Sequence, residues 1–147
     1  MNTITKTDLL AYMRGHKLAV VATTNGKGAP EAALVGIAAM DKHELIFDTV
    51  SSSRKHANLV LHPRVAVTFS GPGEKTLQYE GLAFPISTNG SLDAAYREAY
   101  YAAWPDGRER LNWEGIVYWG ITPVWARYSD FDRGPLITEF HWDDGQA

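Results

Sequence analysis

The sequence of 147 residues contains no cysteine. Disulfides, thiolate nucleophiles and cysteine-ligated metal ions are therefore excluded, and a chain without disulfides suits the cytoplasm. An excess of charge of one sign is also lacking, because basic and acidic residues are interspersed and the net charge is −3. A general nucleic-acid surface needs a basic face, so we expect no nucleic-acid partner.

Long apolar runs are missing as well. No stretch approaches the ~20 apolar residues of a membrane-spanning helix, and charged residues throughout 1–17 argue against a signal peptide. We therefore expect a cytoplasmic protein without a membrane partner, folded as a single domain over residues 1–147. The five histidines show no spacing typical of a metal site, so we expect no bound metal.

What the sequence does contain is a succession of short β-branched and aromatic runs between turn residues. These runs predict strands at 17–24, 31–40, 44–49, 64–71, 76–87, 115–122, 124–131 and 135–142. Helices are expected near 5–15, 53–61 and 91–104. Thr5 or Thr7 with Asp8 would cap the first helix, and Ser91 the third. Because the strands adjoin in sequence, we expect antiparallel pairing and a mainly β fold, a barrel or sandwich with flanking helices.

The stretch FDTVSSSRK, residues 47–55, joins a strand to a helix in an unusual way. Arg54 and Lys55 fall in the first turn of the helix, where the positive end of the helix dipole disfavours cations. A bound anion would reverse that cost, because helix N-termini attract phosphate and both side chains are phosphate ligands. Thr49, Ser51 and Ser53 add hydroxyl donors. The stretch therefore predicts a phosphate cradle.

An ordinary alternative explains the same residues without a ligand. The helix start would simply be solvated, and its cations would pair with Asp48 or Glu44. For Asp48 itself we expect a capping role, in which its carboxylate accepts backbone N–H bonds in the turn of Ser51 and Ser53.

The segments IFDTVSSSRK and HANLVLHPRVAVTF, residues 46–55 and 56–69, resemble the pyridoxamine-phosphate-oxidase-like family of FMN-binding split barrels. The resemblance runs from about residue 6 to residue 131. It implies a split barrel and a homodimer with the cofactor site at the subunit interface. It also implies that Arg54 and Lys55 hold the FMN phosphate, with Ser53 and Thr49 assisting.

Further residues follow from the same resemblance. The backbone at Leu34 and Val35 would run beside the isoalloxazine ring, and Gln78 would offer a polar side chain to the phosphate or the ring. Trp119 and Trp125 of one subunit would approach the flavin of the other. For these tryptophans, simple core packing is the alternative.

The chain departs from the oxidase pattern at three places. Ala33 stands where the oxidase carries a basic residue, and Asp48 where it carries an aromatic one. The segment VWARYSDFDRG, residues 124–134, lacks the Arg-x-His substrate motif. We therefore expect an FMN-dependent oxidoreductase acting on a small organic substrate other than pyridoxamine phosphate, with no catalytic side chain assigned. A non-catalytic flavin- or haem-binding stress protein, a deazaflavin-dependent reductase of the same fold and a purely structural barrel remain as alternatives.

Overall fold

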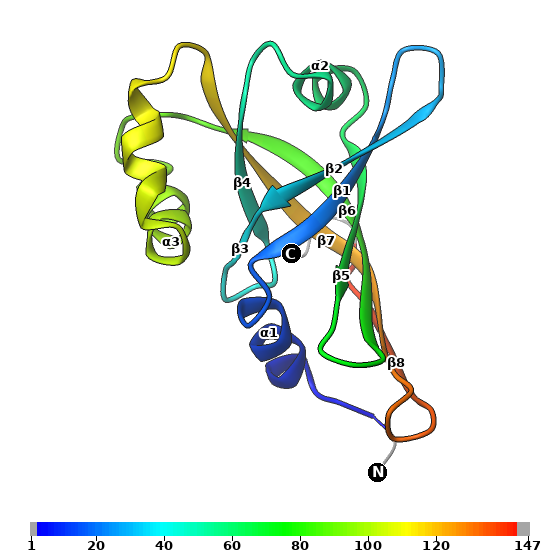
Figure 1. Cartoon of the computed structure of the whole chain (residues 1–147). Helices are drawn as coiled ribbons and strands as arrows, with labels where there is room; N and C mark the ends of the chain where they lie inside the picture. The colour runs from blue at the N-terminus through cyan, green and yellow to red at the C-terminus, as the bar shows by residue number, and fades with distance from the viewer. Residues whose placement is uncertain (1–2, 144–147) are drawn as a thin grey trace.

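An antiparallel sheet of eight strands curls into a half-barrel in the computed structural model, which describes residues 3–143 (Figure 1). The prediction of a mainly β fold is confirmed. The strands are β1 (Leu18–Thr24), β2 (Pro30–Gly36), β3 (Ala38–Ala39), β4 (Leu45–Val50), β5 (Arg64–Ser70), β6 (Lys75–Ile86), β7 (Ile116–Asp130) and β8 (Leu136–His141). The helices are α1 (Lys6–Arg14), α2 (Arg54–Leu61), α3 (Ala94–Ala103) and the 3-10 helix η1 (Pro105–Asn112).

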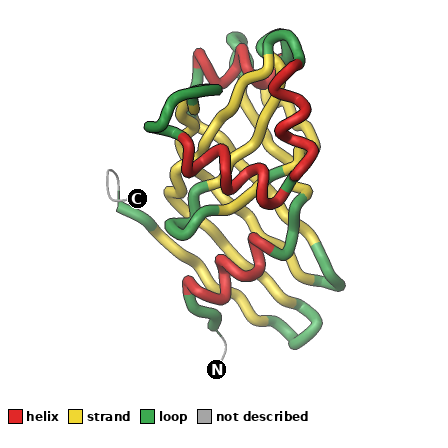
Figure 2. The backbone as a smooth tube through the Cα atoms, turned by 90° about the vertical axis from the view of Figure 1, so that its left-hand side faces the viewer, coloured by secondary structure: helices red, strands yellow, loops and turns green. Residues whose placement is uncertain are grey.

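The order of the strands leaves the half-barrel open beside β2. The strands pair in the order β2-β1-β5-β6-β7-β4-β3, and β8 pairs with β7 beyond the end of β4. The strand β2 therefore ends the sheet, and half of its backbone groups point away from β1. In Figure 1, α2 lies at one end of the barrel and α1 at the other. Figure 2, turned by 90°, shows several helical segments crossing the strands on the side that faces the viewer.

Alternating side chains fill the barrel. On β5, Val65, Val67 and Phe69 are buried while the residues between them are exposed, the pattern of a strand with one covered face. Tyr79 on β6 is also buried, and its hydroxyl donates to the carbonyls of His43 and Ile121 at 2.8 and 3.2 Å. Burial raises the pKa of Tyr79 well above its usual value, so this hydroxyl stays a neutral donor.

The first helix begins as the sequence predicts. The Thr5 hydroxyl accepts from the Asp8 N–H at 3.1 Å, and the Asp8 carboxylate accepts from the Thr5 N–H at 2.9 Å. The two bonds form the capping box. The Thr5 N–H and the Thr5 hydroxyl, which both donate to the Asp8 carboxylate, lower the pKa of Asp8. Leu9 and Met13 on the inner side of α1 are buried in the core.

The predicted strands differ from the observed ones at two places, Pro123 and Ile37. Pro123 does not separate two strands, because β7 runs through it with a bulge, where Gly81 pairs with Pro123 and Glu80 with Trp125. On the other side of β7, the pairing with β4 ends at Ile121 and that with β8 starts beyond Pro123. The missing N–H of proline therefore interrupts no ladder there.

Conversely, the predicted strand 31–40 is broken at Ile37 into β2 and β3. The Trp104 indole N–H donates to the Ile37 carbonyl at 3.1 Å, so this carbonyl is bonded outside the sheet. The indole also covers Gly36 so closely that a Cβ there would lie 2.8 Å from the ring. A glycine is therefore required at this contact.

The third helix begins later than predicted. It starts at Ala94, and Ser91 is not its cap. Asp93 precedes the helix, but its carboxylate accepts from the Ser87 N–H at 2.7 Å instead of capping. Pro105 ends α3 and starts η1, which the sequence pattern did not predict. In residues 3–143, no helix has the length and apolar character that a membrane crossing requires.

Candidate cofactor site at the start of helix α2

The junction between β4 and α2 brings the hydroxyls of Thr49 and Ser53 together at the helix start. Ser53 is the N-cap, and its oxygen accepts from the His56 N–H at 3.2 Å. The same oxygen accepts from the Thr49 hydroxyl at 3.0 Å. With its acceptor capacity occupied in this way, the Ser53 hydroxyl keeps its own hydrogen for an incoming acceptor. Thr49 thus orients Ser53, and the first N–H groups of α2 lack intrahelical partners.

The two cations that follow stand at a helix start with no acidic residue in its first turn. Arg54 Nη1 lies 3.3 Å from Glu31 Oε2, and the Arg54 side chain is 77% exposed. Lys55 makes no ion pair with any residue in the range 3–143. Burial lowers the pKa of Lys55, and the charge of Asp48 acts in the opposite direction.

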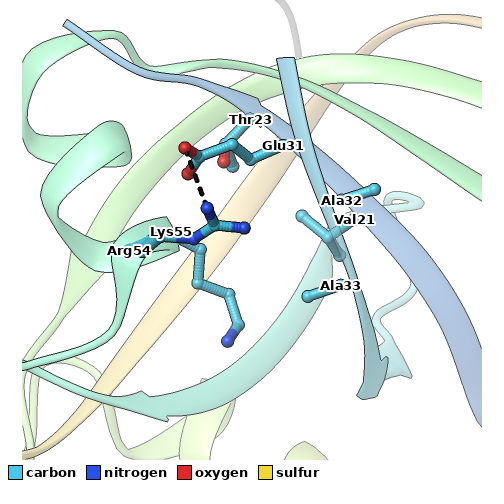
Figure 3. Close-up of a pocket in the computed structure, with 7 residues that line it drawn as sticks. All are labelled: Val21, Thr23, Glu31, Ala32, Ala33, Arg54 and Lys55. Atoms are coloured by element: carbon cyan, nitrogen blue, oxygen red, sulfur yellow. Dashed lines mark ion pairs between the residues drawn. The ribbon is translucent and has the colours of Figure 1, made fainter. Parts of the chain in front are cut away.

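A cavity of about 130 Å³ lies between these cations and the inner face of β1 and β2. Its walls are formed by Val21, Thr23, Glu31, Ala32, Ala33, Arg54 and Lys55. Figure 3 shows Arg54 reaching towards Glu31 while the Lys55 ammonium is directed away from that carboxylate. The cavity is smaller than the ~300–1,000 Å³ of typical cofactor pockets. It suits a phosphate-sized group, and the rest of a larger cofactor would need a further surface.

Glu31 is a cavity-lining residue that the sequence analysis missed. Its side chain is only 16% exposed, and its two oxygens accept from Asn58 Nδ2 at 2.8 Å and Asn25 Nδ2 at 3.2 Å. The Asn58 bond, the Asn25 bond and the charge of Arg54 lower the pKa of Glu31, in that order of effect. The period-two alternation of β2 was the available signal, because it puts Glu31 on the same face as Val35.

The capping role expected for Asp48 is wrong. Its carboxylate accepts from the Tyr100 hydroxyl at 2.9 Å and from Arg110 Nε at 2.7 Å. The Asp48 and Arg110 side chains are 12% and 17% exposed. Burial and the charge of Asp48 raise the pKa of Tyr100. Burial alone would lower the pKa of Arg110, but its hydrogen bonds to Asp48 and Tyr100 raise this pKa on balance. Asp48 therefore joins β4 to α3 and η1.

The ordinary alternative for the helix start is also wrong in its choice of partners. Arg54 pairs with Glu31 rather than with Asp48 or Glu44. Glu44 instead accepts from the Tyr96 hydroxyl at 2.8 Å. The cradle is thus occupied in part by a carboxylate from the strand opposite, 23 positions away in sequence.

The other predicted residues lie in four places: the turn before α2, the edge strand β2, the outer face of the sheet and the side of α2. Ser51 lies in the turn and bonds Gly115, since its N–H donates to that carbonyl at 2.7 Å. Val35 is buried and faces the barrel, whereas Leu34 is exposed on the outer face. The backbone of both belongs to the edge strand β2, close to the cradle.

Gln78 and Trp125 lie on the outer face of the sheet, apart from the cradle. Gln78 is exposed and pairs with Thr68 and Arg127 on the neighbouring strands. The Arg127 guanidinium stands over the Trp125 ring at 5.5 Å. Trp119, in contrast, is buried beside α2, and its Nε1–H donates to His56 Nδ1 at 3.1 Å. The structure thus does not bring all the predicted contacts together within one chain.

Residues 6–129 match the pyridoxamine 5'-phosphate oxidase family, and the chain belongs to this family. A relative described as pyridoxine/pyridoxamine 5'-phosphate oxidase, from Anaeromyxobacter dehalogenans, is 32% identical over 91 residues. Those residues are 58% of this chain and 46% of the relative, so the match spans less than half of that enzyme.

Solved structures show the same fold at low identity. A heme-binding protein from Mycobacterium smegmatis superposes with a TM-score of 0.74 and 16% identity, covering 90% of this chain and 56% of its own. An FMN-binding protein related to pyridoxamine 5'-phosphate oxidase, from Nostoc punctiforme, superposes with a TM-score of 0.71 and 15% identity. The match covers 97% of this chain and 91% of the Nostoc protein. The predicted split barrel is therefore confirmed, and proteins of this fold include binders of two different cofactors.

Proposed function

We propose that the chain binds FMN, with the phosphate at the start of α2, and uses the flavin in the oxidoreduction of a small organic substrate. The main observation in support is that Arg54 and Lys55 lie in the first turn of a helix that has no acidic residue there. The cavity beside them has the size of a phosphate group, and the Ser53 hydroxyl has a hydrogen to donate. The FMN-binding description of the Nostoc relative supports the same cofactor.

The residues of the chain divide the work of binding. Lys55 would supply a compact positive charge, Arg54 a planar fork of donors, and the N–H groups of α2 a partial positive charge. Thr49 holds Ser53 in place through their hydroxyl bond. The bound flavin would supply the transfer of hydride or electrons, and the protein would supply position and electrostatics.

Pyridoxamine phosphate is not the substrate that we propose. The region 124–134 lacks the Arg-x-His motif. Its Arg127 is engaged by Glu139 at 2.6 Å and by the face of Trp125. A substrate phosphate would have to break both contacts, so a substrate without a phosphate group suits this chain better.

A homodimer with the cofactor between subunits would complete the site. The cavity accommodates only part of FMN, and β2 presents an unpaired edge next to it. In such a dimer the outer-face residues Gln78 and Trp125 of one chain could reach the flavin of the other. Light scattering with FMN present tests this, and a mass of one chain would contradict it.

Iron ligation by His56 through Nε2 is disfavoured by the hydrogen bond between His56 and Trp119. Trp119 can only donate through its indole N–H, so His56 Nδ1 must be the acceptor and the proton of the neutral ring lies on Nε2. A protonated Nε2 has no lone pair for iron. His56 as it stands is therefore a poor haem ligand, whereas FMN needs no such ligand.

The test is a titration of the apoprotein with FMN, followed by the quenching of flavin fluorescence. Arg54→Ala and Lys55→Ala should each weaken FMN about tenfold or more, because a charge-assisted hydrogen bond is worth ~1.5–3 kcal/mol. Arg108→Ala is the matched control, since Arg108 pairs with Glu98 at 2.7 Å in an exposed ion pair that lies outside the cavity walls. Equal FMN affinity in all variants would refute the assignment. Reduction of bound FMN by a nicotinamide donor then separates an enzyme from a storage protein.

A further inference from the structure

The Glu31 carboxylate is not placed as an ordinary surface charge. It lies in the wall of the cavity that holds Arg54 and Lys55, and its ion pair with Arg54 spans that cavity from strand to helix (Figure 3). A phosphate entering the cavity would meet this negative charge directly. The site therefore contains one group that repels the proposed ligand and that also occupies one of its two cationic ligands.

The two partners of this ion pair differ in mobility. Glu31 is held by the amides of Asn58 and Asn25, and the Asn58 amide is fixed in turn by a 2.9 Å bond to the buried Thr23 hydroxyl. Arg54 is mostly exposed and has a long, flexible side chain. When an anion arrives, the carboxylate stays where it is and the guanidinium must turn away from it.

This inference rests on the function proposed above. We propose that the Glu31 carboxylate competes with the phosphate group for Arg54 and so limits how tightly the cradle holds that group. Arg54 is shared between the carboxylate and the ligand, so Lys55 is the principal phosphate ligand. Glu31 then sets the affinity for phosphorylated flavin specifically. Riboflavin has the same ring and ribityl chain but no phosphate, and its affinity should not depend on this carboxylate.

A purely structural role for Glu31 makes a different prediction. Anchoring α2 to β2 would require all of its contacts, so any loss would loosen the cradle and weaken every flavin. A direct bond from Glu31 to a ribityl hydroxyl would also weaken FMN and riboflavin together. Neither role makes a variant that binds FMN more tightly while leaving riboflavin unchanged. The negative charge of Glu31 does so, through direct repulsion of the phosphate or through competition for Arg54, and a variant that also lacks Arg54 separates these two effects.

The experiment compares the wild-type apoprotein with Glu31→Gln, which preserves the shape and one acceptor oxygen. Glu98→Gln is the matched control, because Glu98 also pairs with an arginine, Arg108, at 2.7 Å, but outside the cavity walls. FMN and riboflavin are titrated by fluorescence quenching. Removing one like charge and one exposed ion pair should tighten FMN about three- to tenfold and change riboflavin less than twofold. When Arg54 is already replaced by alanine, adding Glu31→Gln should tighten FMN much less than it does in the wild-type background.

Two results would overturn the inference while leaving the FMN proposal intact. One is FMN affinity that is unchanged or weaker in Glu31→Gln. The other is an equal change for FMN and riboflavin. If wild-type protein binds no flavin, the proposed function fails instead, and inorganic phosphate becomes the probe. Phosphate should then raise the melting temperature of Glu31→Gln more than that of wild type, and an equal rise would refute the competition.

Discussion

The ion pair between Asp48 and Arg110 offers the sharpest test of how the structure supports the cradle. Arg110 donates through Nε to Asp48 at 2.7 Å and through Nη2 to the Tyr100 hydroxyl at 2.9 Å. Both charged side chains are largely buried. The pair thereby fixes the end of β4, immediately before Thr49, against α3 and η1. We consider the variant Arg110→Met, which preserves most of the apolar stem.

The expected loss of stability follows from the burial of the pair. Breaking a buried ion pair from one side costs ~3–5 kcal/mol because the remaining charge is left unpaired. Here the Tyr100 hydroxyl still donates to Asp48, and both side chains retain some exposure. We therefore expect a loss of about 2–3 kcal/mol in the free energy of unfolding. For a domain of this size the melting temperature should fall by roughly 5–10 °C.

Urea denaturation followed by circular dichroism measures this change, with Arg108→Met as the control for an exposed arginine. The double variant Asp48→Asn, Arg110→Met also removes the unpaired carboxylate charge, so it should recover about 1 kcal/mol or more of the lost unfolding free energy. In Arg110→Met alone, Asp48 is free to attract Lys55, so FMN affinity should fall as well. A loss below about 0.5 kcal/mol, the scale of an exposed pair, would show that the network is not a buried anchor.

Three further outcomes are expected. FMN affinity should fall as pH rises through the lowered pKa of Lys55, because phosphate binds the protonated amine. The fall should begin below ~10.4, the ordinary pKa of lysine. In a fluorescence titration, Lys55→Arg should abolish this fall. Thr5→Ala should lower the unfolding free energy by ~1 kcal/mol through the lost capping box, and an unchanged urea midpoint would contradict it. Trp119→Phe should release the tautomer of His56, so nitrogen NMR should show a single Nε2–H form in wild type and a mixture in the variant.

The sequence predicted those parts of the fold that depend on near neighbours. The capping box at Thr5, the alternation of β5 and the helix after Ser53 are all set within a few residues. The wrong strand boundaries lie where contacts with residues far away in sequence determine the backbone conformation. Trp104 breaks the strand at Ile37 from 67 positions away, and the continuity of β7 through Pro123 depends on where β4 and β8 stop.

The same distinction applies to the candidate site. Arg54 and Lys55 could be found because a cation at a helix start is a local conflict between charge and dipole. Glu31 could not be assigned, because its place opposite the cations comes from the packing of α2 over β1 and β2. Asp48 was misplaced for the same reason, since its partner Arg110 lies 62 positions along the chain.

These long-range partners also explain how the chain tolerates two cations at a helix start before any ligand binds. Glu31 offsets part of the charge of Arg54, and the field of Asp48 reaches Lys55. Neither carboxylate gives its cation a close, buried ion pair, because Arg54 remains mostly exposed and the strongest partner of Asp48 is Arg110. Under the proposed function, this balance lets the helix start fold while leaving positive charge available for an anion. Under the same proposal, stronger internal pairing would compete with phosphate for both cations.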